Sequence, residues 1–150
     1  MSSRRESIIA TVAARLGVIA KSDGFLTDMG STLTINDYPQ FGPDDPRQAL
    51  VLMVGDEDGQ WRGRGLIVNL PMTCLVLVDA DLTSDGWRAI EQGISDVKRA
   101  IEIDDDRSLG GLLTGPFERG NVEVIPREPG SLAMGAVIPY TLTFKDAWGG

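Results

Sequence analysis

The chain has 150 residues, the size of one ordinary domain, and carries 22 acidic against 14 basic side chains, a formal net charge of −8. It has no histidine and a single cysteine, Cys74. These counts exclude Ser-His-Asp and Cys-His nucleophile systems, histidine-ligated metal sites and a disulfide within the chain. The acidic excess argues against a surface that binds nucleic acid by neutralising phosphates. Because no run of about 20 apolar residues occurs, we expect no membrane span.

The first predicted element is an amphipathic helix over residues 4–16. One apolar stripe with a period of 3.6 residues supports it, made of Ile8, Ile9, Val12, Ala13 and Leu16. Ser2 or Ser3 is available to cap the start, and Gly17 to end it. An export signal is the alternative interpretation, but its apolar core between Glu6 and Arg15 is too short to favour it.

Several strands are predicted after an irregular stretch over 22–48. A short strand is expected at 32–35, and three prolines make 38–46 a turn-rich loop. The run 49–54 is apolar on both faces, which suits a central strand, and 55–59 is a turn. Over 66–78 every second residue is apolar, which predicts a long strand. Since Pro71 has no N–H to donate, it should lie at an edge position or a bulge.

A second helix is predicted over 84–103, followed by two more strands. Its apolar face, expected in the core, consists of Trp87, Ile90, Ile94, Val97 and Ile101. Strands follow at 122–124 and at 136–144. The order α-β-β-β-α-β-β predicts a single α+β domain over 1–150, with a mostly antiparallel sheet of about five strands and two helices packed on one face.

No segment supports a catalytic, metal or cofactor site on its own. Residues 81–86 match the opening of a calcium loop, but Gln92 replaces the bidentate Glu, and helix capping explains the same residues. The acidic run 104–106 could hold Mg²⁺, although a solvated turn is the favoured interpretation. The glycines at 110–115 lack a following Lys, and Gly63 and Gly65 lack a third glycine, so both segments are read as turns.

Two tryptophans suggest contacts beyond the domain. Trp61 lies beside Arg62 and Arg64, a composition typical of an interface hot spot, with a cross-strand packing pair as the alternative. Trp148 follows the last predicted strand and needs a neighbour, such as another subunit, to bury it.

From Trp87 onward the sequence resembles tail terminator (tail completion) proteins of long-tailed bacteriophages. The resemblance is carried by ISDVKRAI at 94–101, DDD at 104–106, LGGL at 109–112 and IPYTLTF at 138–144. Specific residues match chiefly over 90–112 and 136–145, and the organisation matches over most of the chain. The resemblance implies a structural virion protein that caps the completed tail tube as a ring, commonly of six subunits, and joins the tail to the head-side connector.

Candidate residues follow from this expectation of a ring. The locally basic first helix and the acidic stretch 79–106, which has nine acids, are candidates for opposite sides of a subunit interface. The interface candidates are Arg4, Arg5, Arg15, Asp104, Asp105, Asp106 and Trp148. The candidates for contact with the tail tube or connector are Tyr38, Phe41, Asp56, Glu57, Asp58, Trp61, Arg62 and Arg64.

The expected partners are the chain itself, a tail tube protein and a connector or neck protein, at the head-proximal end of the tail in the virion, after assembly in the host cytoplasm. DNA would pass an acidic lumen without specific binding. We expect no enzyme activity, cofactor or metal. Three alternatives stay open: another neck or head-closure protein, a small carboxylate-dependent phosphohydrolase that uses a metal, and a monomeric small-ligand module.

Overall fold

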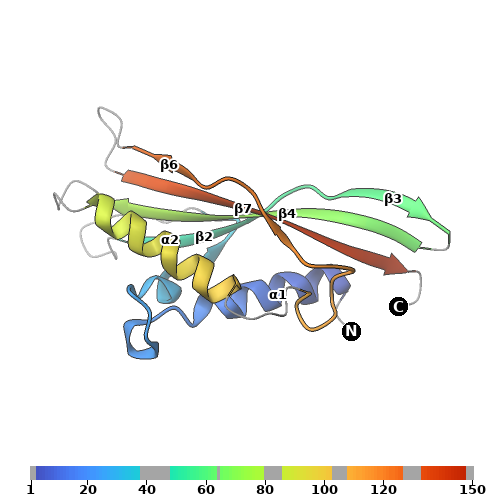
Figure 1. Cartoon of the computed structure of the whole chain (residues 1–150), viewed down its shortest axis with the longest axis horizontal. Helices are drawn as coiled ribbons and strands as arrows, with labels where there is room; N and C mark the ends of the chain where they lie inside the picture. Colours follow the sequence, from blue (N-terminus) through green and yellow to red (C-terminus); the bar gives the residue numbers. More distant parts are fainter. Residues whose placement is uncertain are drawn as a thin grey trace.

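The computed structural model describes residues 3–37, 48–63, 65–79, 86–102, 108–126 and 133–147. The architecture is α+β, with two α-helices packed against a mixed, mostly antiparallel sheet (Figure 1). The elements in chain order are α1 (Arg4–Gly17), the 3₁₀ helices η1 (Lys21–Asp23) and η2 (Met29–Thr32), β1 (Thr34–Ile35), β2 (Gln48–Val54), β3 (Asp58–Arg62), β4 (Gly65–Asp79), α2 (Gly86–Glu102), β5 (Glu118–Arg119), β6 (Glu123–Ile125) and β7 (Ala133–Ala147).

The centre of the sheet is the long antiparallel pair of β4 and β7. The two strands stay in one continuous register of 15 pairs, from Gly65 opposite Ala147 to Asp79 opposite Ala133. On the outer side of β4, β3 pairs with one end and β2 with the other; on the outer side of β7, β5 and β6 do the same. Strands β3 and β6 therefore lie at opposite ends and on opposite edges of the sheet (Figure 1).

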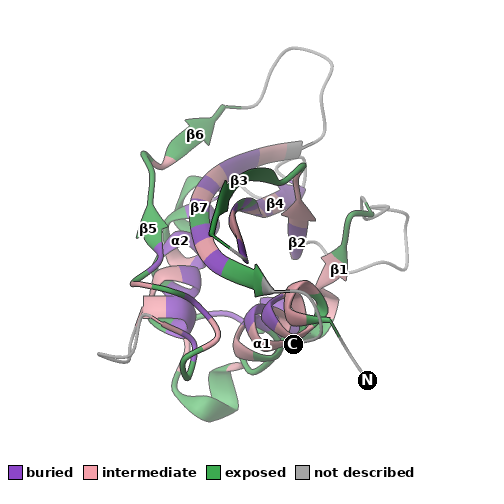
Figure 2. Ribbon diagram, turned by 90° about the vertical axis from the view of Figure 1, so that its right-hand side faces the viewer, coloured by how far each residue is buried: buried purple, intermediate pink, exposed green. Residues whose placement is uncertain are grey.

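Both helices cover the same face of the sheet, as the alternation in the sequence predicts. On β4 the even-numbered residues from Val68 to Val78 are buried, and on β7 those from Ala136 to Phe144. They pack against the apolar stripes of the helices, including Ile8 and Val97. Exposed residues gather instead on β3, β5 and β6 (Figure 2).

The predicted helix over 4–16 is confirmed, and its start is built as expected. The Ser3 hydroxyl oxygen accepts the backbone N–H of Glu6 at 3.1 Å, which satisfies one of the donors that every helix start leaves open. Within the described residues the sheet has seven strands, two more than predicted. The extra strands are β3, predicted as turn and flank, and the two-residue β5; both are exposed and lack apolar alternation.

The prediction that Trp87 lies in the core is wrong, because its side chain is 56% exposed. It lies in the first turn of α2, about 100° around the helix from the centre of the buried face. Ile90, Ile94, Val97 and Ile101 are buried as predicted. Small residues such as Gly93 complete the buried face, since a Cβ there would lie 2.5 Å from the Val76 side chain.

Pro71 lies inside β4 at the level where β4 changes partner on its outer side. The β3 ladder ends at Asn69 and the β2 ladder begins at Met72. Between them, the Pro71 carbonyl oxygen accepts the N–H of Gly55 at 2.9 Å. In an extended strand the N and C=O of one residue point to the same side, so the missing N–H of Pro71 also faces this changeover.

Strand β7 repeats this device around Pro139. Its outer side pairs with β6 up to Val137 and with β5 from Tyr140 onward. In the gap, the Pro139 carbonyl oxygen accepts the N–H of Gly120 at 2.8 Å. Each of the two long strands thus carries a proline where its outer partners change, and the register between the strands is undisturbed.

Candidate functional site

Two arginines of α1 that were predicted at a subunit interface have partners within the chain. The Arg15 guanidinium donates to the carbonyl oxygen of Ile101 at 2.9 Å, in the last turn of α2. Carbonyl oxygens there lack helical partners, and a cation at this end of a helix is favourable. Arg4 donates to the carbonyl oxygen of Leu112 at 3.2 Å. Both arginines therefore tie α1 to the region at and beyond the end of α2.

The third arginine of α1, Arg5, connects the predicted subunit-interface residues with the predicted residues for tail-tube or connector contact. Arg5 forms a salt bridge with Glu57, with 3.0 Å between Nη1 and Oε2, and both side chains are about two-fifths exposed. Pairs this exposed contribute little to stability. Asp56 and Asp58, on either side of Glu57, are exposed. The geometry therefore places the start of α1 next to the turn that leads into β3.

Strand β3 is the most exposed candidate segment among the described residues. All five of its residues are exposed, and Trp61 shows 63% of its surface, the largest value among the exposed large apolar side chains of the described residues. Within that part of the chain β3 pairs only with β4, so its other edge is uncovered. Arg62 ends the strand. The prediction that Trp61 and Arg62 belong to a contact surface is compatible with this exposure.

The remaining candidates lie outside the described residues. They are Tyr38, Phe41, Arg64, Asp104, Asp105, Asp106 and Trp148.

A buried carboxylate on α2 organises the segment that follows α1. Asp96 is only 1% exposed, and its Oδ1 accepts the N–H of Leu26 at 3.0 Å. Its Oδ2 accepts both the N–H and the hydroxyl of Thr27, at 2.8 and 2.7 Å. Hydrogen bonds to an ionised acceptor are among the stronger ones in proteins. Nothing in the sequence pattern indicated this role, because Asp96 occurs in a stretch rich in acids.

Arg99, one turn further along α2, holds the same segment. Its Nη1 donates to the carbonyl oxygen of Gly24 at 2.6 Å, and its guanidinium carbon lies 4.8 Å from the centre of the Phe25 ring. Together with Asp96 it fixes residues 24–27 against α2. These polar side chains of α2 are thus occupied by structural contacts.

A second polar cluster joins α2 to β5 and β7. The Tyr140 hydroxyl donates to Oε2 of Glu102 at 2.8 Å, and the Arg119 Nε lies 3.1 Å from the same oxygen. Burial raises the pKa of Tyr140 well above its ordinary value, and the hydrogen bond to Glu102 raises it further. A tyrosine held in its neutral form and bonded to an ion pair serves as an anchor for the end of α2.

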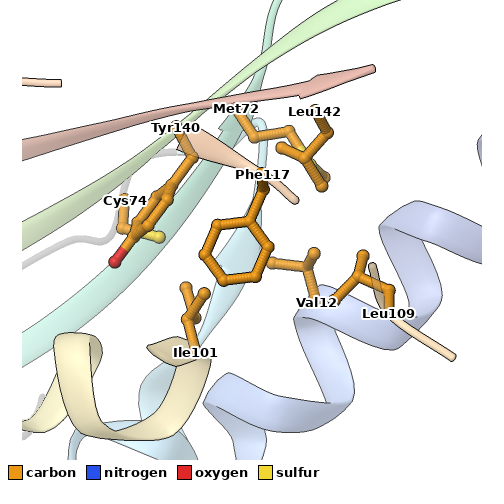
Figure 3. Close-up of a pocket in the computed structure, with 8 residues that line it drawn as sticks. All are labelled: Val12, Met72, Cys74, Ile101, Leu109, Phe117, Tyr140 and Leu142. Atoms are coloured by element: carbon orange, nitrogen blue, oxygen red, sulfur yellow. The ribbon is translucent and has the colours of Figure 1, made fainter. Parts of the chain in front are cut away.

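A cavity within the described part of the core is apolar and small (Figure 3). Its lining residues are Val12, Met72, Cys74, Ile101, Leu109, Phe117, Tyr140 and Leu142. A volume of about 10 Å³ is at the lower limit for one water molecule and far below that of a substrate site. Burial raises the pKa of the Cys74 thiol to about 12, which makes it a poor nucleophile.

The described residues contain no group of three or more Cys, Asp or Glu side chains placed to hold a metal ion. None of their helices is both long and apolar enough to cross a membrane.

Comparison with protein-family models gives no match, and comparison with curated proteins finds no significantly similar sequence. The candidate surface of the chain is therefore defined by its own geometry: an exposed β3 edge with Trp61 and Arg62, next to the turn at Glu57.

Proposed function

We propose that the protein is a structural subunit of a bacteriophage tail, which caps the completed tail tube as a homo-oligomeric ring and joins it to the head-side connector. The proposal rests on the sequence resemblance to tail terminators. The observation that supports it best is the presence of two unlike, exposed strand edges, β3 and β6, at opposite ends of the sheet.

Two unlike edges matter because of how rings close. A ring of identical subunits uses a heterologous contact, in which one surface of each copy meets a different surface of the next. A symmetric dimer, by contrast, needs one self-complementary surface. The separation of β3 from β6 along the sheet fits the first requirement.

The polar clusters of the described residues also fit a structural role. Asp96, Arg99, Glu102 and Tyr140 all bind other parts of the chain. They brace α2 against the segment after α1 and against β7. A subunit braced by internal contacts, with exposed residues at the strand edges β3 and β6, suits an assembly protein.

In the proposed ring, part of the acidic stretch 79–106 faces the lumen. Carboxylates there would repel the phosphates of DNA, so that DNA passes without adhering. Reversal of the charges at Asp104, Asp105 and Asp106 should then retain DNA in the tail and lower infectivity. Unchanged DNA passage in that variant would remove the lumen from the proposal.

The experiment that tests the function has two parts. Native mass spectrometry and electron microscopy of the purified protein should show a closed ring, by itself or on purified tail tubes. Binding to tail tubes should then block their further elongation. Binding only to head-side connectors would instead identify a neck or head-closure protein. A monomer that ignores both partners, and whose melting temperature rises with Mg²⁺ or Mn²⁺, would favour the phosphohydrolase.

A further inference from the structure

We infer that β3 of one copy pairs with β6 of the next copy as an antiparallel strand addition, with Trp61 opposite Val124. This inference rests on the proposed ring and names the contact that closes it. Both edges carry exposed apolar side chains, with Trp61 63%, Val124 46% and Ile125 43% exposed. Exposed edge strands are templates for pairing with another chain.

The backbone of each edge is oriented for this register. The Pro71 carbonyl points to the outer side of β4, so by alternation Gly65, Ile67 and Asn69 point the same way and bond β3. Their partners on β3 are Arg62, Gln60 and Asp58. The residues between them, Gly59 and Trp61, must therefore turn their N–H and C=O groups outward.

The same alternation holds on β7. The Pro139 carbonyl points to the outer side, so Val137 and Gly135 point there as well and bond Glu123 and Ile125 of β6. Val124, between these two, turns its backbone groups outward. Trp61 and Val124 can thus exchange both backbone hydrogen bonds across the new interface.

The faces of the two sheets also agree in this register. Trp61 lies opposite Leu66, and Val124 lies opposite Ala136; Leu66 and Ala136 belong to the even-numbered, helix-facing series of β4 and β7. Pairing Trp61 with Val124 therefore continues the sheet with the helices of both copies on one side. A shift by one residue would put the apolar side chains on opposite faces.

Charge supports the antiparallel direction. With Trp61 opposite Val124, Arg62 lies opposite Glu123 and Gln60 opposite Ile125, and neither Arg62 nor Glu123 has an ion-pair partner among the described residues. Opposite charges facing each other across strands are favourable. A pairing of two β3 edges, the competing arrangement, would set Trp61 against Gly59 in the register centred on Gln60 and would leave β6 without a partner copy.

A contact between β3 and β6 cannot form within one copy. Trp61 is level with Leu66, and Val124 is level with Ala136 and hence with Val76. These levels lie ten residues apart along β4, which is about 33 Å at roughly 3.3 Å per residue. A disulfide between the two edges must therefore join different copies.

The test uses the double variant with Gln60→Cys and Ile125→Cys. This pair exchanges no backbone bonds in the proposed register, which is the closer kind of cross-strand pair. Under mild oxidation the purified protein, with tail tubes present if they are needed for assembly, should give a covalent ladder up to the ring size. Cys74 is buried and leaves the background low. The double variant with Gln60→Cys and Val124→Cys, whose side chains face opposite sides, should give at least tenfold less.

The outcomes separate the contact from the function. If native mass spectrometry shows a ring but the double variant with Gln60→Cys and Ile125→Cys gives no covalent oligomers, the β3–β6 pairing is overturned and the proposed function still stands. Covalent dimers from Gln60→Cys alone would show paired β3 edges and overturn it too. A protein that neither forms rings nor binds tail tubes overturns both. As a second support, Arg62→Glu should weaken assembly and the added Glu123→Arg should restore it.

Discussion

The backbone N–H of Gly55 donates to the carbonyl oxygen of Pro71 at 2.9 Å, and Gly55 also packs closely against the proline ring. A Cβ built on Gly55 would lie 2.9 Å from Cγ of the proline ring, which is closer than real Cβ atoms approach. The turn after β2 is therefore packed against the one residue of β4 that cannot donate to a neighbour. Pro139 and Gly120 repeat the arrangement, with the corresponding Cβ at 3.0 Å from Cγ.

Replacing Gly55 by Ala should destabilise the fold by about 1–2 kcal/mol, because a proline ring cannot move aside as the end of a flexible side chain can. Gly17→Ala is the matched control, since nothing lies within 4 Å of its Cβ position at the end of α1. That variant should be as stable as the unaltered protein or slightly more so. Urea unfolding measures both, and equal stability of the two variants would contradict the packing described.

Replacing Asp96 by Asn should lower the free energy of unfolding by about 1–3 kcal/mol, because an amide leaves one of the backbone or hydroxyl donors of residues 26 and 27 unpaired in a buried place. Hydrogen exchange of the Leu26 and Thr27 amides should also become faster. Glu91→Gln, at an exposed position of the same helix, removes the same charge and should change neither quantity. An equal loss in both variants would assign the effect to net charge.

Tyr140→Phe should cost about 1 kcal/mol at about pH 8, where the hydroxyl donates to Glu102. The pKa of Tyr140 is raised by folding above its ordinary value of 10.0. The contribution of the hydroxyl to stability is therefore complete well below pH 10.0 and declines as the pH rises through that value, because the unfolded chain releases the proton first. The stability difference between the two proteins should narrow as pH rises from about 9 to 11, as measured by urea unfolding at each pH. A difference that stays constant would show that the hydroxyl ionises alike in both states.

Cys74 should not react with a thiol reagent in the folded protein. Burial raises its pKa to about 12, so at about pH 8 almost no thiolate is present, and the side chain is 1% exposed. Modification should proceed at the rate of unfolding and accelerate with denaturant. A cysteine placed at Gln60 on the exposed β3 should react at once under the same conditions. Rapid reaction of Cys74 itself would mean that the core opens locally.

Trp87→Gln should leave stability within about 0.5 kcal/mol of the unaltered protein, whereas Ile90→Ala should cost about 2–5 kcal/mol. Both residues belong to the same apolar stripe in the sequence, but only Ile90 is buried. Thermal or urea unfolding distinguishes them. A large cost at Trp87 would restore the sequence-based prediction that it lies in the core.

The sequence predicted those parts of the fold that burial imposes. Alternation along β4 and β7 and the stripe on α1 are direct records of which side chains face the core, so their bounds and their common face could be inferred. Strand β3 has no such record, because both of its faces are exposed and its pairing with β4 comes from the hairpin. The prediction for Trp87 was wrong for a related reason: small residues such as Gly93 belong to the buried face of α2, so its centre lies away from the large apolar residues, and Trp87 falls at its flank.

The polar contacts were less predictable than the core. Asp96 and Arg99 differ little in sequence context from the exposed Glu91. They differ from it in the structure because residues 24–27, distant in the chain, lie against Asp96 and Arg99 and accept or donate hydrogen bonds there. Likewise, the basic residues of α1 were predicted to seek acidic partners in another copy. Arg4 and Arg15 instead bind backbone carbonyl oxygens of their own chain, which carry no sequence signal. Whether their remaining hydrogens contact a second copy stays a prediction.

The unbroken register of β4 on β7 has a consequence for size. A hydrogen-bonded ladder of 15 pairs neither stretches nor slips by less than a whole step, so the spacing between the β3 and β6 edges is fixed by a count of residues. In an assembly joined through those edges, the length of this ladder would set the distance between the two contacts that each subunit makes. Two residues added to both strands would lengthen the ladder by about 7 Å. The length of β4 and β7, and not the chemistry of the contact, would then set the width of the passage.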